Sequence, residues 1–169
     1  MNLKIVQSKS SMLSDFSFAN SIQIDDQLIE YFRVEHPRTH DVAVAACDHL
    51  PGVNIGEFTL PVPSSQREND FYVSLLEPGD RDTKGRARFW LGITRTGNGA
   101  WKKDSNDGPL TFSNWNTGEG TDVRAFSVAA AMLKSNGDWL GEWLDLPNDS
   151  RSYVVICTKK TKVSKCKNL

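Results

Sequence analysis

The sequence has few cysteines, no long apolar run and almost no net charge, and each shortage excludes a class of protein. Three cysteines in 169 residues, with no Cys-x-x-Cys or His/Cys spacing, argue against a structural zinc site. No apolar stretch approaches the roughly 20 residues that a membrane-spanning helix needs. A net charge of −1 gives no general attraction to nucleic acid or to an anionic membrane. What remains is a globular domain of ordinary composition that is long enough to bury a sizeable core.

The two ends of the chain are polar segments without a clear regular pattern. Residues 1–15 lack the compact apolar segment of a signal peptide, so we expect either that a leader has been removed or that the protein is not secreted by that route. Residues 159–169 include five lysines. They are predicted to be a solvated terminus rather than a binding arm.

A strand and a helix are predicted in the first third of the chain. Residues 28–34 form a short β-rich run, and a proline follows it. Thr39 can cap a helix over residues 41–50. Four apolar residues of this helix recur at helical spacing and are expected to face the core: Val42, Ala45, Ala46 and Leu50.

A second helix has a clear start signal. Ser65, with Glu68 three residues later, forms a capping box, and Pro78 with Gly79 ends the helical pattern. Its apolar face is expected to consist of three residues: Phe71, Leu75 and Leu76.

The second half of the chain predicts short strands joined by polar loops. Residues 89–94 have the composition of a buried strand, and residues 153–158 are strongly β-branched. The apolar run 126–133 fits a strand or a helix by periodicity, and the Asn-Gly pair at 136–137 favours a hairpin, with residues 139–143 as the return. Two early helices followed by many short strands predict an α+β domain, and they indicate no reaction.

The cysteines leave two alternatives open. Cys47 and Cys157 each lie in an apolar, regular segment, so they are either two buried free thiols or the two halves of a disulfide. Such a disulfide would close a loop of ~110 residues and stabilise the fold by on the order of 4 kcal/mol. Cys166 is left over, and we expect that it can pair between chains to give a disulfide-linked dimer.

No arrangement of nucleophile and base indicates catalysis. His36, His40 and His49 cluster near the first helix without a serine or cysteine nucleophile at a recognisable turn. Pro37 prevents His36 and His40 from lying on one regular helix. We interpret these histidines as a solvated helix entrance, and we expect that the chain is not an enzyme.

Four short motifs occur in a characteristic order. A strand and a helix that carries a cysteine are followed by Trp90-Leu91-Gly92-Ile93. Phe112-Ser113-Asn114-Trp115 then leads into Gly118-Glu119-Gly120-Thr121, and Trp143-Leu144-Asp145 precedes the last strand. In this order and spacing the chain resembles the C-type lectin-like domain. The resemblance implies an α+β fold with two helices packed on short antiparallel sheets and a long loop region.

The resemblance also implies a division of the chain and a disulfide. Residues 1–27 would be an N-terminal arm or extra strand, residues 28–160 the lectin-like domain, and residues 161–169 a polar, lysine-rich tail. The outer disulfide of the family corresponds to Cys47 and Cys157.

The inner disulfide of the family is absent. Its halves correspond to a position near Phe126 or Ser127 and to Asn148, and this chain has no cysteine at either place. Because both halves are missing, no orphan thiol is left in the core. Asn148 also begins an Asn-x-Ser sequon, which would carry a glycan if the chain is secreted.

The resemblance implies only part of a calcium site. Calcium takes six to eight oxygen ligands. Two ligands are kept here, Glu119 and Asp145, with Asp122 and Glu142 as further acids nearby. Glu119 and Asp145 are expected to be surface acids or to make local loop contacts rather than to bind metal. We therefore expect no tight calcium site and no other cofactor.

Three substitutions remove the rest of the site. Gly120 stands where the family has a proline, and Thr121 supplies a hydroxyl in place of an amide ligand. Leu144 replaces the second amide and can neither coordinate an ion nor hydrogen-bond a sugar.

Ligand binding is expected on what we call the long-loop face. It consists of six residues: Glu119, Thr121, Asp122, Trp139, Glu142 and Asp145. Trp90, Trp115 and Trp143 are expected in the core, and so is Trp139, although an exposed Trp139 would suit stacking on a sugar or a protein contact.

The function that the resemblance implies is recognition outside the cell. We expect a secreted or extracellular, non-catalytic glycoprotein domain that binds carbohydrate without the calcium-coordinated mechanism of the family. The alternative is a calcium-independent module that binds a cell-surface or extracellular protein, as in receptors and adhesion proteins. Neither reading involves nucleic acid or membrane insertion by this chain.

Overall fold

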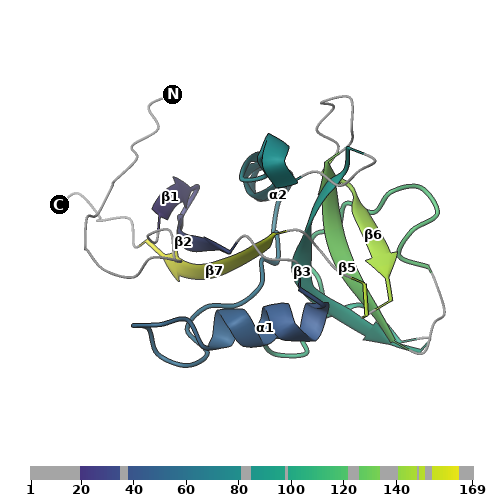
Figure 1. The fold of residues 1–169 in the computed structure, drawn as a ribbon, viewed down its shortest axis with the longest axis horizontal. Helices are drawn as coiled ribbons and strands as arrows, with labels where there is room; N and C mark the ends of the chain where they lie inside the picture. The colour runs from purple at the N-terminus through teal and green to yellow at the C-terminus, as the bar shows by residue number, and fades with distance from the viewer. Residues whose placement is uncertain are drawn as a thin grey trace.

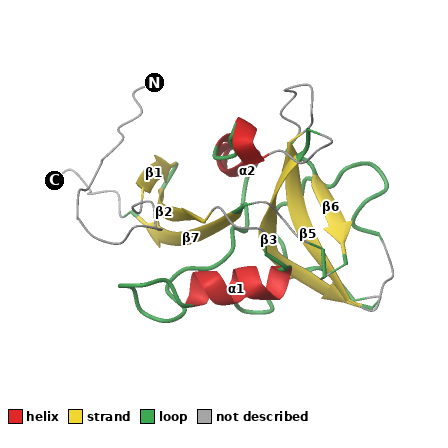
Figure 2. Ribbon diagram, viewed as in Figure 1, coloured by secondary structure: helices red, strands yellow, loops and turns green. Residues whose placement is uncertain are grey.

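Two helices and two small antiparallel sheets build an α+β fold (Figures 1 and 2). The structure is a computed structural model of the whole chain, and within residues 126–133 it describes the backbone alone. The residues that it describes are 20–34, 38–80, 85–97, 99–121, 126–133, 141–147, 149–150 and 154–163. The predicted α+β class is confirmed.

The first sheet, in the order β1-β2-β7, joins the two ends of the described chain (Figure 1). β1 (Asn20–Ile24) and β2 (Gln27–Val34) form a hairpin whose turn places Asp25 at a φ of 55°. β7 (Val155–Lys162) pairs antiparallel with the full length of β2. The strand predicted over 28–34 is confirmed, and β1 is the extra strand predicted before it.

β7 continues past the predicted end of the domain. Its burial is complete up to Thr158, and the strand then carries lysines to residue 162. The Lys159 ammonium contacts the carboxylates of Glu57 and Glu30, and that of Lys160 contacts Glu68. The prediction of a solvated terminus from residue 159 is therefore wrong for the start of that segment, because carboxylates from distant segments hold the first two lysines.

The second sheet has the order β4-β3-β5-β6. Its strands are β3 (Ala87–Thr96), β4 (Lys102–Lys103), β5 (Phe126–Leu133) and β6 (Trp143–Leu146). The strands predicted over 89–94 and 126–133 are confirmed as parts of β3 and β5. The predicted return strand is shifted, since β6 begins at Trp143 and residues 139–140 lie outside the described residues.

A glycine in β3 allows another segment to cross the sheet. The Gly92 amide donates to the Pro61 carbonyl at 3.0 Å. A Cβ at position 92 would lie 2.8 Å from the carbonyl oxygen of Leu60, which is closer than packed atoms approach. The Trp-Leu-Gly-Ile motif therefore needs glycine at its third position for a packing reason.

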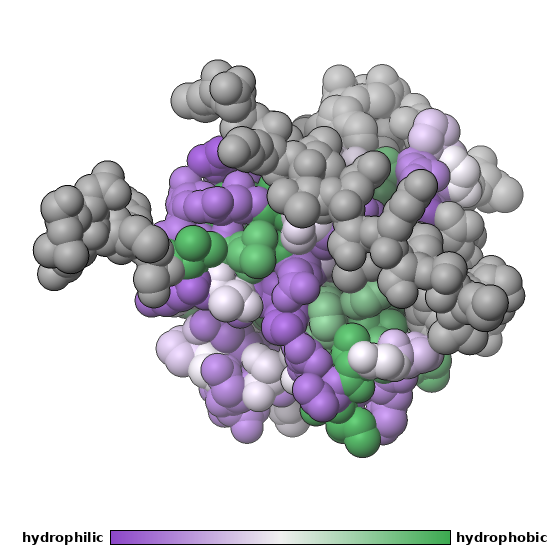
Figure 3. Space-filling model, turned by 90° about the vertical axis from the view of Figure 1, so that its left-hand side faces the viewer, coloured by the Kyte–Doolittle hydropathy of each residue, from purple (hydrophilic) through white to green (hydrophobic). Residues whose placement is uncertain are grey.

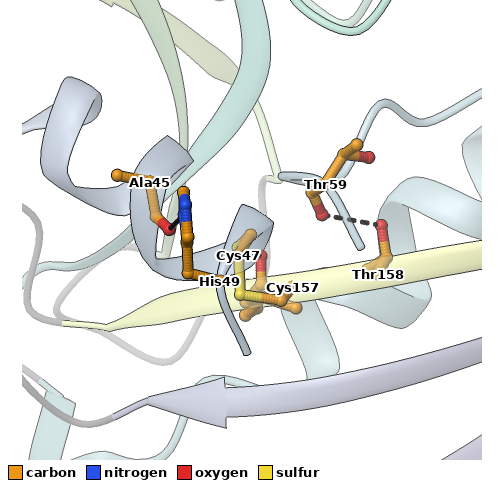
Figure 4. Close-up of a disulfide and its surroundings, with 7 residues drawn as sticks. Ala45, Cys47, His49, Thr59, Cys157 and Thr158 are labelled. Carbon is orange, nitrogen blue, oxygen red and sulfur yellow. Dashed lines mark hydrogen bonds between the residues drawn. A yellow bond between two sulfur atoms is a disulfide. The ribbon is translucent and has the colours of Figure 1, made fainter. Parts of the chain in front are cut away.

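α1 (His40–Asp48) is joined to β7 by the disulfide between Cys47 and Cys157 (Figure 4). Their Cα atoms are 5.2 Å apart, which is an ordinary disulfide separation. The Cys47–Cys157 disulfide is confirmed. It was one of two alternatives for these cysteines, and the resemblance implied it. Thr39 is the N-cap residue, although its side chain makes no capping hydrogen bond.

The buried face of α1 is not the predicted one. His40, Ala43 and Cys47 face the core. Val42 is 49% exposed, Ala45 is also exposed, and Leu50 is buried but lies beyond the end of the helix. The disulfide explains the difference, because it fixes the rotation of α1 with Cys47 pointing inward.

α2 (Gln66–Ser74) begins where the capping box predicts. The Glu68 amide donates to the Ser65 hydroxyl at 3.3 Å. The predicted apolar face is wrong in part, since Phe71 and Leu75 are half-buried and only Leu76 is buried. Four residues of the helix are buried, and the first two of them are polar: Glu68, Asn69, Tyr72 and Val73. A short 3-10 helix, η1 (Pro78–Asp80), follows.

Glu68 is a buried carboxylate with a complete set of partners. One oxygen accepts hydrogen bonds from the Ser64 amide and hydroxyl at 2.8 and 2.6 Å. The other accepts from the Tyr72 hydroxyl at 2.7 Å and contacts Lys160. Burial alone would raise the pKa of Glu68, but the charge of Lys160 and these donors hold the pKa below its ordinary 4.5. Burial and the same carboxylate raise the pKa of Tyr72.

The described surface is mixed in polarity. On the side of the molecule that carries the first sheet, hydrophilic residues form a band between hydrophobic patches (Figure 3). None of the helices within the described ranges has the length and apolar character that crossing a bilayer requires.

Removal of the disulfide is expected to lower the free energy of unfolding by roughly 3–4 kcal/mol, because it releases a cross-link over a sequence separation of 110. The comparison is Cys47→Ala/Cys157→Ala against the parent chain, both with Cys166→Ser so that no thiol exchange occurs. Denaturant unfolding measures the difference. A loss below about 1 kcal/mol would mean that packing alone holds α1 on β7.

Glu68→Gln is expected to lower the free energy of unfolding by roughly 2–3 kcal/mol at neutral pH. This is less than the loss expected when a fully buried ion pair is broken, because Lys160 is partly exposed. Since the pKa of Glu68 is lowered in the folded state, its stabilisation is present above the unfolded pKa and is lost as the pH falls through the folded pKa. The difference in the free energy of unfolding between wild type and variant should therefore decrease below pH 4.5. Denaturant unfolding at several pH values tests this, with Asp70→Asn on the exposed face of α2 as control.

Candidate functional site

The segment that follows Phe112 runs along the free edge of β6. The Trp143 amide donates to the Asn114 carbonyl at 2.8 Å, and the Asn116 amide donates to the Trp143 carbonyl at 3.0 Å. Trp115 and Trp143 form a parallel bridge. These bonds cover an edge that would otherwise expose unpaired backbone groups, and they bring the next residues alongside Asp145.

The structure brings together the two residues that correspond to calcium ligands of the resembling family. Glu119 Oε2 accepts a hydrogen bond from the Asp145 backbone amide at 3.1 Å. Asp145 is 5% exposed, because the alternation of β6 places it on the same inward side as Trp143. Glu119 thus makes the local contact that was expected of it. The expectation of a surface acid is wrong for Asp145.

A cation and an indole hold the turn that contains Glu119. This turn, residues 118–121, points the Gly120 carbonyl at two donors. Arg95 Nη1 donates to that oxygen at 3.1 Å and Trp101 Nε1 donates at 2.9 Å. The Arg95 guanidinium also lies over the Trp101 ring, 5.0 Å from its centroid. The turn is therefore fixed by side chains of the protein.

Arg95 is buried more deeply than an arginine usually is. The residue is 8% exposed, and its Nε and Nη2 atoms have no hydrogen-bond partner among the described residues. An arginine cannot lose its charge at accessible pH. The 118–121 turn therefore lies beside a permanent positive charge.

Trp115 packs against the backbone of Gly120. A Cβ on Gly120 would lie 2.6 Å from Cδ2 of the Trp115 ring, and Gly120 has a φ of +76°. Both the contact and the dihedral exclude other residues. Trp115 also stacks on Trp101, with centroids 4.6 Å apart. Trp115 is half-buried, so its predicted place in the core is corrected to the boundary between core and turn.

Trp143 and Trp90 are core residues, as predicted, and both are fully buried. The Trp143 indole donates to Asn69 Oδ1 at 2.7 Å, and the Asn69 amide group donates to the Gly141 carbonyl at 3.0 Å. α2 is thereby connected to the strand that carries Asp145. The buried asparagine explains why the predicted apolar face of α2 was wrong.

The other residues of the long-loop face are only partly located. Thr121 is exposed, and its hydroxyl donates to the Gly118 carbonyl at 3.1 Å. Glu142 is half-buried just before β6. Asp122 and Trp139 lie outside the described residues, as do His36, Asn148 and Cys166. Among the residues that are described, no three His, Cys, Asp or Glu side chains are grouped to hold a metal ion.

The histidine prediction is wrong for His40. This residue is 2% exposed, and its Nε2 lies 3.1 Å from the Leu91 carbonyl oxygen and 3.3 Å from Asp104 Oδ2. Since both neighbours are acceptors, Nε2 is the nitrogen that carries the proton. His49 is exposed, as expected of a solvated helix end.

Arg95 and Trp101 are site residues that were not predicted from the sequence. The strand was predicted to end at Thr94, but β3 runs to Thr96. Period-two alternation then places Arg95 on the same face as the buried Ile93, which marks it as an inward-facing charge. A longer strand prediction would have revealed this signal.

No model of a known protein family matches this chain. The assignment of a function therefore rests on the motifs and contacts of the chain itself.

Glu119→Ala is expected to lower the free energy of unfolding by about 1 kcal/mol, because the Asp145 amide loses its acceptor. Glu119→Gln keeps an acceptor oxygen and is expected to cost less. Glu142→Ala removes a nearby half-buried acid and serves as the matched control, with a change below about 0.5 kcal/mol. Equal losses in the Glu119 and Glu142 alanine variants, measured by denaturant unfolding, would mean that the contact with Asp145 has no special weight.

Proposed function

We propose that this chain is a non-catalytic recognition domain of the C-type lectin-like kind, which binds carbohydrate at the long-loop face without calcium. One observation carries the calcium-independent part: protein groups occupy the turn that would hold the ion. The Glu119 carboxylate is bonded to the Asp145 amide, and the Gly120 carbonyl is bonded to Arg95 and Trp101.

The arrangement of elements supports the lectin-like part of the proposal. The disulfide joins the first helix to the last strand, as the resemblance implies. The Trp-Leu-Gly-Ile motif lies in β3, at the centre of the second sheet. The segment from β4 to β5 forms a long excursion that returns along β6.

The positive charge of Arg95 at the 118–121 turn supports ligand binding without calcium. A calcium site of this family would gather acidic and amide oxygens around the turn, because calcium takes six to eight oxygen ligands. Here the Arg95 guanidinium reaches the turn itself, 3.1 Å from the Gly120 oxygen. A fixed positive charge at that distance opposes a divalent cation.

The same face offers groups that can bind a sugar directly. The Thr121 hydroxyl is exposed, and Glu119 and Glu142 are half-buried. These side chains can exchange hydrogen bonds with the hydroxyls of a sugar without a metal ion.

The disulfide also supports a place outside the cell. Disulfides persist in oxidising compartments and are rare in the cytosol. An oxidising compartment would preserve this cross-link, which spans a sequence separation of 110 and stabilises the fold.

A glycan array probed with the full chain, with calcium and again with chelator, tests the proposal. Binding is expected to be the same in both conditions, and calorimetry with millimolar calcium is expected to show no binding heat. Thr121→Ala is expected to weaken binding about fivefold, the effect of one lost hydrogen bond. Thr161→Ala, the same change on the exposed end of β7, is the control and should have no effect.

Two results would overturn the proposal. Loss of glycan binding with chelator would restore the calcium-dependent mechanism. Absence of binding to any glycan would favour the alternative function, recognition of a protein.

A further inference from the structure

A polar cleft of about 360 Å³ is lined by residues other than those of the long-loop face. Its walls come from the loop that precedes α2, from the loop that follows β4, and from β7. It shares no residue with the long-loop face, so a role for it does not depend on the function proposed above.

Backbone hydrogen bonds fix both loops of the cleft. Thr59 and Thr158 exchange backbone bonds of 2.9 and 2.7 Å, which hold the first loop on β7. The Thr158 hydroxyl also donates to the Thr59 carbonyl at 3.4 Å, close to the disulfide (Figure 4). In the second loop, the Lys103 amide donates to the Gly108 carbonyl at 3.0 Å and the Asp107 amide donates to the Lys103 carbonyl at 2.9 Å. The cleft is therefore preformed.

Three lysines line this cleft, and two of them are held in place from the protein side. Lys159 contacts Glu57 and Glu30. Lys160 contacts Glu68 and donates to the Val62 carbonyl at 2.5 Å. These carboxylates restrict the lysine side chains while they offset much of their charge.

Lys103 differs from the other two lysines. In the described part of the chain no carboxylate pairs with it. β4 consists of Lys102 and Lys103, and the alternation of a strand sends them to opposite sides. Lys102 is exposed, whereas Lys103 is half-buried and lines the cleft. The cleft therefore contains one ammonium group whose charge is not compensated by a neighbour.

The remaining lining is rich in hydrogen-bonding side chains. Hydroxyls and one amide line the cleft together with Lys103: Thr59, Ser64, Ser105, Asn106 and Thr111. Glu57 also lines the cleft, and its carboxylate is paired with Lys159. Gln27 also lines the cleft, and its Oε1 is buried with no partner among the described residues. Such a lining can satisfy several hydroxyls and one anionic group of the same ligand.

We propose that this cleft is a second binding site, which takes the oxyanion of an acidic oligosaccharide with Lys103 as its charged contact. A charge-assisted hydrogen bond from the ammonium would hold a sulfate or carboxylate group, and the hydroxyl-rich wall would hold the sugar. A second cleft of about 290 Å³ shares Thr59, Val62 and Ser105 with it, and its lining adds two acids, Asp48 and Asp104. These acids oppose an anionic group in the second cleft, so the oxyanion is expected beside Lys103.

Calorimetry of the full chain with three hexasaccharide probes tests the site: a sulfated heparin fragment, the same fragment stripped of sulfate but with its carboxylates, and neutral maltohexaose. At roughly 0.15 M salt, charge attraction beyond about 8 Å is screened. We expect one or both acidic probes to bind and the neutral probe not to bind, and the two acidic probes distinguish sulfate from carboxylate. Lys103→Gln is expected to weaken binding about tenfold.

Lys102→Gln is the matched control, because it makes the same charge change on the opposite side of the same strand. It is expected to leave the affinity nearly unchanged, and thermal unfolding should show both variants folded. An equal loss in both variants, binding of maltohexaose as tight as that of the acidic probes, or no binding of any probe would overturn the inference. Thr121→Ala should not change binding of the acidic probes, so failure of this site and failure of the long-loop face are distinguishable.

Discussion

The covalent bond between Cys47 and Cys157 constrains most of the described structure. It fixes which side of α1 faces inward. His40 is thereby buried against Trp90 in an edge-to-face contact, with the two ring centroids 5.5 Å apart. It also holds β7 at the centre of the molecule, where that strand pairs with β2, meets the loop at Thr59 and carries the lysines of the polar cleft. A cross-link over 110 residues can do this because it removes many open conformations of the chain.

The candidate site is held by internal bonds where the proposed family would use an ion. Glu119 accepts from a backbone amide, and Arg95 and Trp101 share one carbonyl oxygen. The indoles of Trp101, Trp115 and Trp143 then pack in series, from the turn to the core. A turn supported in this way has a shape of its own before any ligand arrives, which lowers the entropy that binding has to overcome.

Local signals in the sequence were sufficient to predict where the main helices and strands lie. They were insufficient to predict which side of each element faces the core. The capping box at Ser65 and the β-branched last strand depend on neighbouring residues, and both were found. Arg95 was missed because the strand was predicted to end one residue before it. His40 was misread because its acceptor, the Leu91 carbonyl, is 51 positions away. Lys159 meets Glu57 across 102 positions. Contacts of this range are set by tertiary packing, and no periodicity in the chain records them.

The contact between Gly120 and Trp115 limits how this turn could change in evolution or by design. Position 120 has no room for any side chain while the indole lies 2.6 Å from where a Cβ would be. A larger residue there would require a smaller residue at 115, and that change would also remove the support of Trp101. The φ of +76° would still disfavour any residue other than glycine. Positions 115 and 120 are therefore coupled, and the turn keeps its form only while both are unchanged.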